Sequence, residues 1–142
     1  IIVISDGGSC KEFKTMATTI EYGTYIIDLC TAMLENPGGL TRPQGKRIFV
    51  IRKETVNFLT EYLQHESNSL PQLLQYLTHN ATSPLEIVMK NCEILMIGRL
   101  GKMHTDYYEA VIEILDCCHA MVDDLEDMRQ NLDQLMGDLG IA

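Results

Sequence analysis

A glycine turn near the start of the sequence has the residue types that bind phosphate groups. Ile1 to Ile4 form an apolar, β-prone run, and Asp6-Gly7-Gly8-Ser9 follows it, directly before a helical pattern. Backbone N–H groups at a strand–turn–helix junction can hold a phosphate. Neither of the usual glycine-rich nucleotide-binding motifs is present, however. We therefore interpret residues 6–9 as a turn and helix cap, and keep a nucleotide- or phosphate-binding fragment or enzyme as the alternative function.

Sulfur and imidazole side chains gather late in the sequence, but their spacing is not that of a metal site. The set is Cys92, His104, Cys117, Cys118 and His119. Its last three members are consecutive on a predicted helix, where neighbouring side chains point about 100° apart and cannot converge on one ion. Cys10, in the first turn of a helix, has the position of a reactive thiol, but no partner stands at a diagnostic spacing. The sequence thus predicts no metal, no cofactor and no catalytic residue.

Five cations fall within twelve residues that contain no acid. They are Arg42, Lys46, Arg47, Arg52 and Lys53. Such a cluster can attract phosphate groups, so it is a weak candidate for anion binding. The alternatives are a solvated loop, or a loop that pairs with the acidic last part of the chain.

The acidic residues are concentrated at the other end. The net charge is −9, and residues 101–142 contain 10 Asp and Glu against 2 Lys and Arg, whereas residues 1–100 contain 10 against 9. This balance argues against nucleic-acid binding, which uses basic surfaces. The acids form neither a calcium-loop pattern nor the Glu-x-x-His pairs of a di-metal bundle. We interpret them as a solvated helix face, or as a docking face for a basic partner.

The length and composition indicate one globular domain, residues 1–142. Hydrophobic residues make up 46% of the chain, and no apolar run approaches the roughly 18 residues that a membrane span requires. Five cysteines, an odd number, favour free thiols and an intracellular, cytoplasmic protein. One glycosylation sequon, Asn80-Ala81-Thr82, supports the alternative of a secreted helical signalling protein.

Apolar periodicity predicts an all-α or nearly all-α fold, a four- to five-helix antiparallel bundle with a short two-stranded β element near the N-terminus. The expected helices are 10–35, 53–66, 70–78, 84–98 and 105–137, and the expected strands are 1–4 and 48–51. Residues 36–47 read as a loop. In the second helix Val56, Leu59 and Leu63 are expected to face inward. The helix from 84, capped by Ser83, is the most apolar and is expected to be central.

The end of the last helix carries a second apolar strip. Its residues are Met128, Leu132, Leu135, Met136 and Leu139. If the helix extends beyond the bundle, this strip is exposed, and exposed apolar strips commonly bind partners. The alternative is that it packs as ordinary core. The sequence thus favours a protein–protein interaction module, an adaptor, scaffold or regulatory bundle that binds a protein partner or self-associates, with a small-molecule ligand disfavoured.

Overall fold

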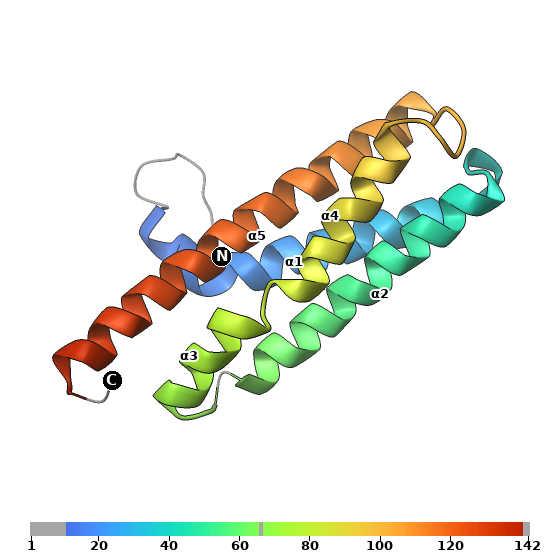
Figure 1. The fold of residues 1–142 in the computed structure, drawn as a ribbon. Coiled ribbons are helices and arrows are strands. Elements are labelled where there is room, and N and C mark those ends of the chain that lie inside the picture. Colours follow the sequence, from blue (N-terminus) through green and yellow to red (C-terminus); the bar gives the residue numbers. More distant parts are fainter. Residues whose placement is uncertain (1–10, 66, 141–142) are drawn as a thin grey trace.

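The computed structural model describes residues 11–65 and 67–140, and this part of the chain is all-α. The predicted antiparallel helical bundle is confirmed (Figure 1). The elements are α1 (Lys11–Leu34), the 3-10 turn η2 (Pro37–Gly39), α2 (Arg42–His65), α3 (Leu70–His79), α4 (Ser83–Met96) and α5 (Thr105–Asp138).

The bundle has four positions, because α3 and α4 follow one another along one side and together run antiparallel to α2 (Figure 1). Helix α2 packs on α1 and α4, whereas α5 packs on α1, α4 and α3. Consequently α2 and α5 occupy diagonal corners and share no substantial contact. One hydrophobic cluster draws buried residues from all five α-helices.

The predicted strand 48–51 is wrong, because these residues lie inside α2. Ile48 and Ile51 are fully buried, whereas Phe49 is half exposed, which is the three-residue spacing of a helix face rather than the alternation of a strand. The proposed partner strand, residues 1–4, lies outside the described residues. Packing against α1 and α4 thus overrides the β-propensity of the run Ile-Phe-Val-Ile.

The expected loop 36–47 is also too long, because α2 begins at Arg42. A reciprocal capping box starts the helix: Gln44 Oε1 accepts from the Thr41 N–H at 2.8 Å, and Thr41 Oγ1 accepts from the Gln44 N–H at 3.2 Å. Pro43 stands in the first turn, where its missing N–H costs nothing. The same side chains reach the loop before α5, since Gln44 Nε2 donates to the Gly101 carbonyl at 2.8 Å and Thr41 Oγ1 to that of Leu100.

Replacing Gln44 by Ala is expected to cost about 1–3 kcal/mol of unfolding free energy, because it removes a cap and leaves the Thr41 N–H and the Gly101 carbonyl of a part-buried joint without this partner. Gln72 is a matched control: it completes the same kind of box with Ser69 at the start of α3, but it is exposed and joins no second segment. We expect Gln72→Ala to cost less than about 1 kcal/mol. Chemical denaturation of both variants measures the difference. Equal losses would contradict a role for Gln44 beyond capping.

The inward face of α2 is displaced from the predicted one. Val56 and Leu63 are exposed, which corrects their expected inward orientation, whereas Phe58 and Tyr62 occupy the core. Leu59 lies at the edge against α1, where a Cβ on Gly23 would lie only 2.8 Å from Leu59 Cδ2. Gly23 thus permits the close approach of α1 and α2.

Helix α4 is a corner helix rather than the central one. Its core face includes Leu85, Val88 and Leu95, but Ile87 and Ile97 are exposed. Apolar residues that lie outside the contacts of α4 with α2 and α5 are therefore exposed to solvent, although the helix is apolar on nearly all sides. The predicted Ser83 cap is also wrong: Ser83 is the first helical residue, and no side chain caps this end.

Candidate interaction surfaces

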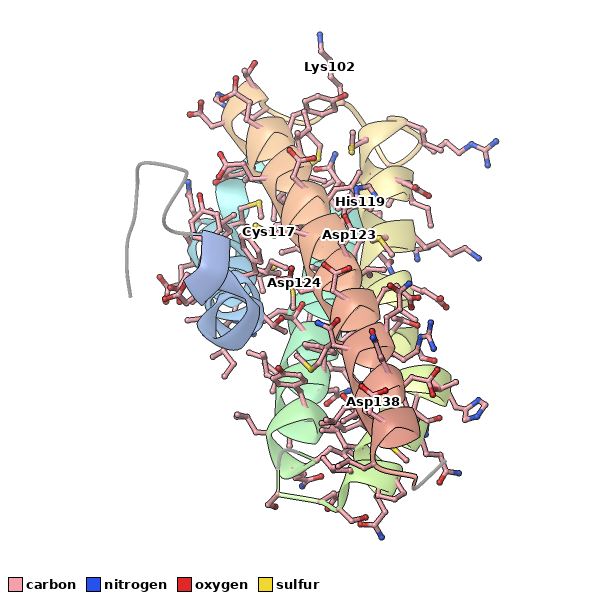
Figure 2. The ribbon with its side chains drawn as sticks, turned by 90° about the vertical axis from the view of Figure 1, so that its left-hand side faces the viewer. Lys102, Cys117, His119, Asp123, Asp124 and Asp138 are labelled. Carbon is pink, nitrogen blue, oxygen red and sulfur yellow. The ribbon has the colours of Figure 1, made fainter. Side chains whose placement is uncertain are left out.

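Helix α5 presents its acidic residues along a face that no other described helix covers. Figure 2 looks onto this face, with α1 on one side of α5 and α4 on the other. Asp123 and Asp138 lie on the side toward the viewer, fifteen residues or about 22 Å apart along the helix. Asp124 lies toward α1, where its charge raises the pKa of Tyr22, after the larger effect of burial.

Glu113 and Glu126 are α5 carboxylates that accept side-chain hydrogen bonds within the described part of the chain. Glu113 accepts a hydrogen bond from the Tyr25 hydroxyl of α1. Glu126 accepts from Arg129 on its own helix, at 2.7 Å between Oε2 and Nη2, and from Gln130 at 2.9 Å. These bonds lower the pKa of Glu126 to about 2. Arg129 is the only Lys or Arg in α5, so the helix itself offers no further cation.

The other exposed acids of α5 are largely uncompensated. Among the described residues, no hydrogen bond or ion pair of the side chain is present at Glu109, Asp116, Asp123, Asp127, Asp133 or Asp138. Fixed like charges repel one another along the helix, at a cost that a bound cation would relieve. This face therefore carries a net negative charge among the described residues.

The predicted apolar strip at the end of α5 divides into two faces. Leu132 and Met136 are 8% and 5% exposed and belong to the core, because α3 packs on this part of α5. The helix does not outrun the bundle along this whole stretch, which corrects the expectation of one continuous exposed strip. Leu135 and Leu139 remain 44% and 58% exposed. Met128 is partly buried, with Sδ 4.0 Å from the Tyr62 hydroxyl.

The predicted anion-binding cations lie on α2. Some of them are hydrogen-bonded within the bundle, and the others are exposed. Arg47 donates to Asn91 of α4 at 3.0 Å, and Arg52 donates to Thr31 of α1 at 3.3 Å. Arg42, Lys46 and Lys53 are exposed. None of the five forms a described ion pair with α5, as expected for helices at diagonal corners. The alternative of a basic loop paired with the acidic helix is therefore wrong for the described residues.

The structure also shows an exposed apolar line on α2 that the sequence analysis does not predict. Phe49, Val56 and Leu63 are 51%, 43% and 49% exposed. Their seven-residue spacing is the available signal. This spacing is easily missed in the sequence, because Phe49 falls in the predicted strand 48–51, and Val56 and Leu63 are predicted to face the core.

The candidate cysteines and histidines that the structure describes lack the properties of a reactive site. Cys30, Cys92, Cys117 and Cys118 are free and buried, and burial raises the pKa of Cys117 to about 11 and of Cys118 to about 12. Such thiols stay protonated and are poor nucleophiles. His104 caps α5 by accepting from the Asp106 N–H, and His119 is exposed. The searched residues contain no group of three potential ligands placed to hold a metal ion. The Asp6–Ser9 turn and Cys10 lie outside the described residues.

The fold defines the class of this chain as an all-α helical bundle. Within residues 11–65 and 67–140, no helix combines the length and apolar character needed to cross a membrane. No protein-family model matches the sequence, and comparison with curated proteins and with solved structures gives no significant match.

Proposed function

We propose that this chain is a protein–protein interaction module, an adaptor or regulatory bundle that binds a basic partner through the C-terminal half of α5. The observation that carries the proposal is the combination of unpaired carboxylates, such as Asp127 and Asp138, with the exposed Leu135 and Leu139 on the same half-helix. We call these four residues the α5 docking face.

The two kinds of residue have complementary roles in binding. Carboxylates at the rim of an interface accelerate association with a cationic partner and select its orientation. Apolar side chains at the centre supply most of the free energy through the area that they remove from water. Burying Leu135 and Leu139 requires no rearrangement of the bundle, since both already face solvent.

The partner best suited to this face is an amphipathic basic helix. A helix can place apolar residues in a line with cations along one side, which matches the docking face, where both acids lie on the same side of Leu135 and Leu139. The four free, buried thiols support an intracellular setting, where thiols stay reduced.

A designed peptide with the chemistry of this partner tests the proposal. The probe is a fluorescent helical peptide with Leu at the a and d heptad positions and Lys elsewhere. We expect the chain to bind it, and Leu135→Ser with Leu139→Ser to weaken binding about tenfold or more, a loss of about 1.4 kcal/mol. Binding should also weaken as salt rises, because the exposed charges are screened. Fluorescence anisotropy measures both effects.

Two controls separate this result from general attraction between opposite charges. A peptide of the same composition in scrambled order should bind much more weakly, because it cannot align its leucines. Ile97→Ser removes an apolar side chain of comparable exposure beyond the end of α4 and should leave binding unchanged. Equal binding of both peptides, or equal effects of the variants, would overturn the proposal.

A further inference from the structure

The exposed side of α2 has the form of a helix-binding seam. Phe49, Val56 and Leu63 stand two turns apart and therefore lie in one line along the helix. Nothing in the described part of the chain covers them, since all three are roughly half exposed. Apolar residues repeated every seven positions form the contact line between two helices in coiled coils.

A hollow of about 390 Å³ lies at the start of this line. It is lined by Leu34 at the end of α1 and by Leu40, Thr41, Arg42 and Gly45. Gly45 precedes Phe49 by one helical turn, so the hollow lies about one turn before the first residue of the apolar line. A Cβ at Gly45 would meet no atom within 4 Å, which shows that the space beside it is open. Its lining offers an apolar side chain a place beside the cation of Arg42.

The charges around the line are positive throughout its first half. Arg42, Lys46 and Lys53 are exposed, and no acid occurs between residues 42 and 53. The Arg52 guanidinium lies 5.6 Å from the centre of the Phe49 ring, so a cation also flanks the aromatic side chain. We call Arg42, Lys46, Phe49, Lys53, Val56 and Leu63 the α2 stripe.

The α2 stripe and the α5 docking face have complementary properties but cannot meet in one molecule. The α2 stripe has apolar residues beside cations, and the α5 docking face has apolar residues beside acids. They lie on diagonal helices. The α2 stripe extends about 32 Å from Arg42 to Leu63, which is long enough to cover the α5 docking face, about 18 Å from Asp127 to Leu139.

From this complementarity we infer that the α2 stripe binds the α5 docking face of a second copy of this chain. The inference rests on the proposed function, for which it names the basic partner. Leu135 and Leu139 pack against the apolar line, while Asp127 and Asp138 meet the exposed cations of α2. Because each copy carries the two surfaces at diagonal corners that face opposite ways, the contact repeats from copy to copy and builds a row of molecules that stays open or closes into a ring.

Charge reversal on each surface in turn tests the inference with the full chain. The α2 variant is Lys46→Glu with Lys53→Glu, and the α5 variant is Asp127→Lys with Asp138→Lys. All four side chains are exposed, so both variants should fold. We expect the unmodified chain to self-associate in sedimentation experiments, and each variant alone to do so about tenfold more weakly or worse.

Mixing the two variants gives the decisive result. The α2 variant then carries two acidic surfaces and the α5 variant two basic ones, so every contact regains opposite charges where the two variants alternate. Sedimentation of the mixture should show association restored toward that of the unmodified chain. Lys90→Glu, a reversal at an exposed position of α4, should leave self-association unchanged. Without restoration in the mixture, or with an unmodified chain that stays monomeric, the inference is overturned.

Filling the hollow provides a test that changes no charge. Gly45→Leu has space for its side chain and occupies the hollow, whereas Gly45→Ala leaves most of it open. The Leu variant should melt at no lower a temperature than the unmodified chain and self-associate about tenfold more weakly, while the Ala variant associates normally. Equal association of the Leu variant would exclude the hollow from the interface. If self-association fails these tests but the basic peptide still binds α5, the proposed function stands and only the second copy is rejected.

Discussion

Replacing Leu132 by Asp is expected to destabilise the bundle by more than about 3 kcal/mol, whereas Leu135→Asp, three residues further along α5, should change stability by less than about 1 kcal/mol. Leu132 is 8% exposed and Leu135 is 44% exposed. The two substitutions introduce the same residue into the same helix, so differences in helix propensity cancel. The remaining difference is the cost of placing a carboxylate in the apolar contact between α3 and α5.

Urea denaturation followed by circular dichroism measures both free energies. Leu132→Ala is the intermediate case, because it removes the apolar volume without adding a charge and should cost about 2–5 kcal/mol if the site cannot collapse. Similar losses for the two Asp variants would contradict the division of the strip. The folded Leu135→Asp chain also serves the binding assay, since it should lose affinity for the basic peptide without unfolding.

The best predictions from the sequence concern the long helices with clear ends. The pattern predicts a last helix over 105–137, and α5 runs from Thr105 to Asp138. It predicts that the first helix ends before Asn36-Pro37-Gly38-Gly39, and α1 ends at Leu34. Both depend on local chemistry: a sustained apolar period, and a segment that cannot continue a helix. Local signals of this strength predict a helix and its ends without knowledge of the tertiary contacts.

The start of α2 shows where such local reasoning fails. Its capping box, Thr41 with Gln44, and Pro43 in the first turn are present in the sequence, but the four β-prone residues at 48–51 favour a strand and a preceding loop. Consecutive Ile, Phe and Val residues are compatible with either a strand or a buried helix face. Only the partners of these residues, α1 and α4, distinguish the two structures.

The candidate surfaces depend even more on tertiary arrangement. The same apolar period describes Leu132 and Leu135, and only the position of α3 buries one and leaves the other exposed. Likewise, charge counting locates the basic and acidic segments correctly but cannot place them at diagonal corners. That separation keeps the two surfaces apart within one molecule.

Replacing Leu95 by Ala is expected to cost about 2–5 kcal/mol of unfolding free energy. Leu95 is 1% exposed on α4, and α4 packs on both α2 and α5. Removing its side chain leaves a space that neighbours on two other helices must fill. Ile97→Ala, two residues later, is the matched control, because Ile97 is 63% exposed and its truncation should cost less than about 1 kcal/mol. Urea melts of the two variants measure the difference.

The Leu95 variant also separates core stability from binding. Leu95 belongs to neither the α2 stripe nor the α5 docking face, but it packs between the two helices that carry them. At a temperature where the variant remains folded, both surfaces keep their exposed residues, so peptide binding and self-association should stay within about twofold of the unmodified chain. A loss of less than about 1 kcal/mol in stability would contradict the packing of α4. A large loss of binding in a folded variant would instead show that the surfaces depend on how α4 spaces α2 from α5.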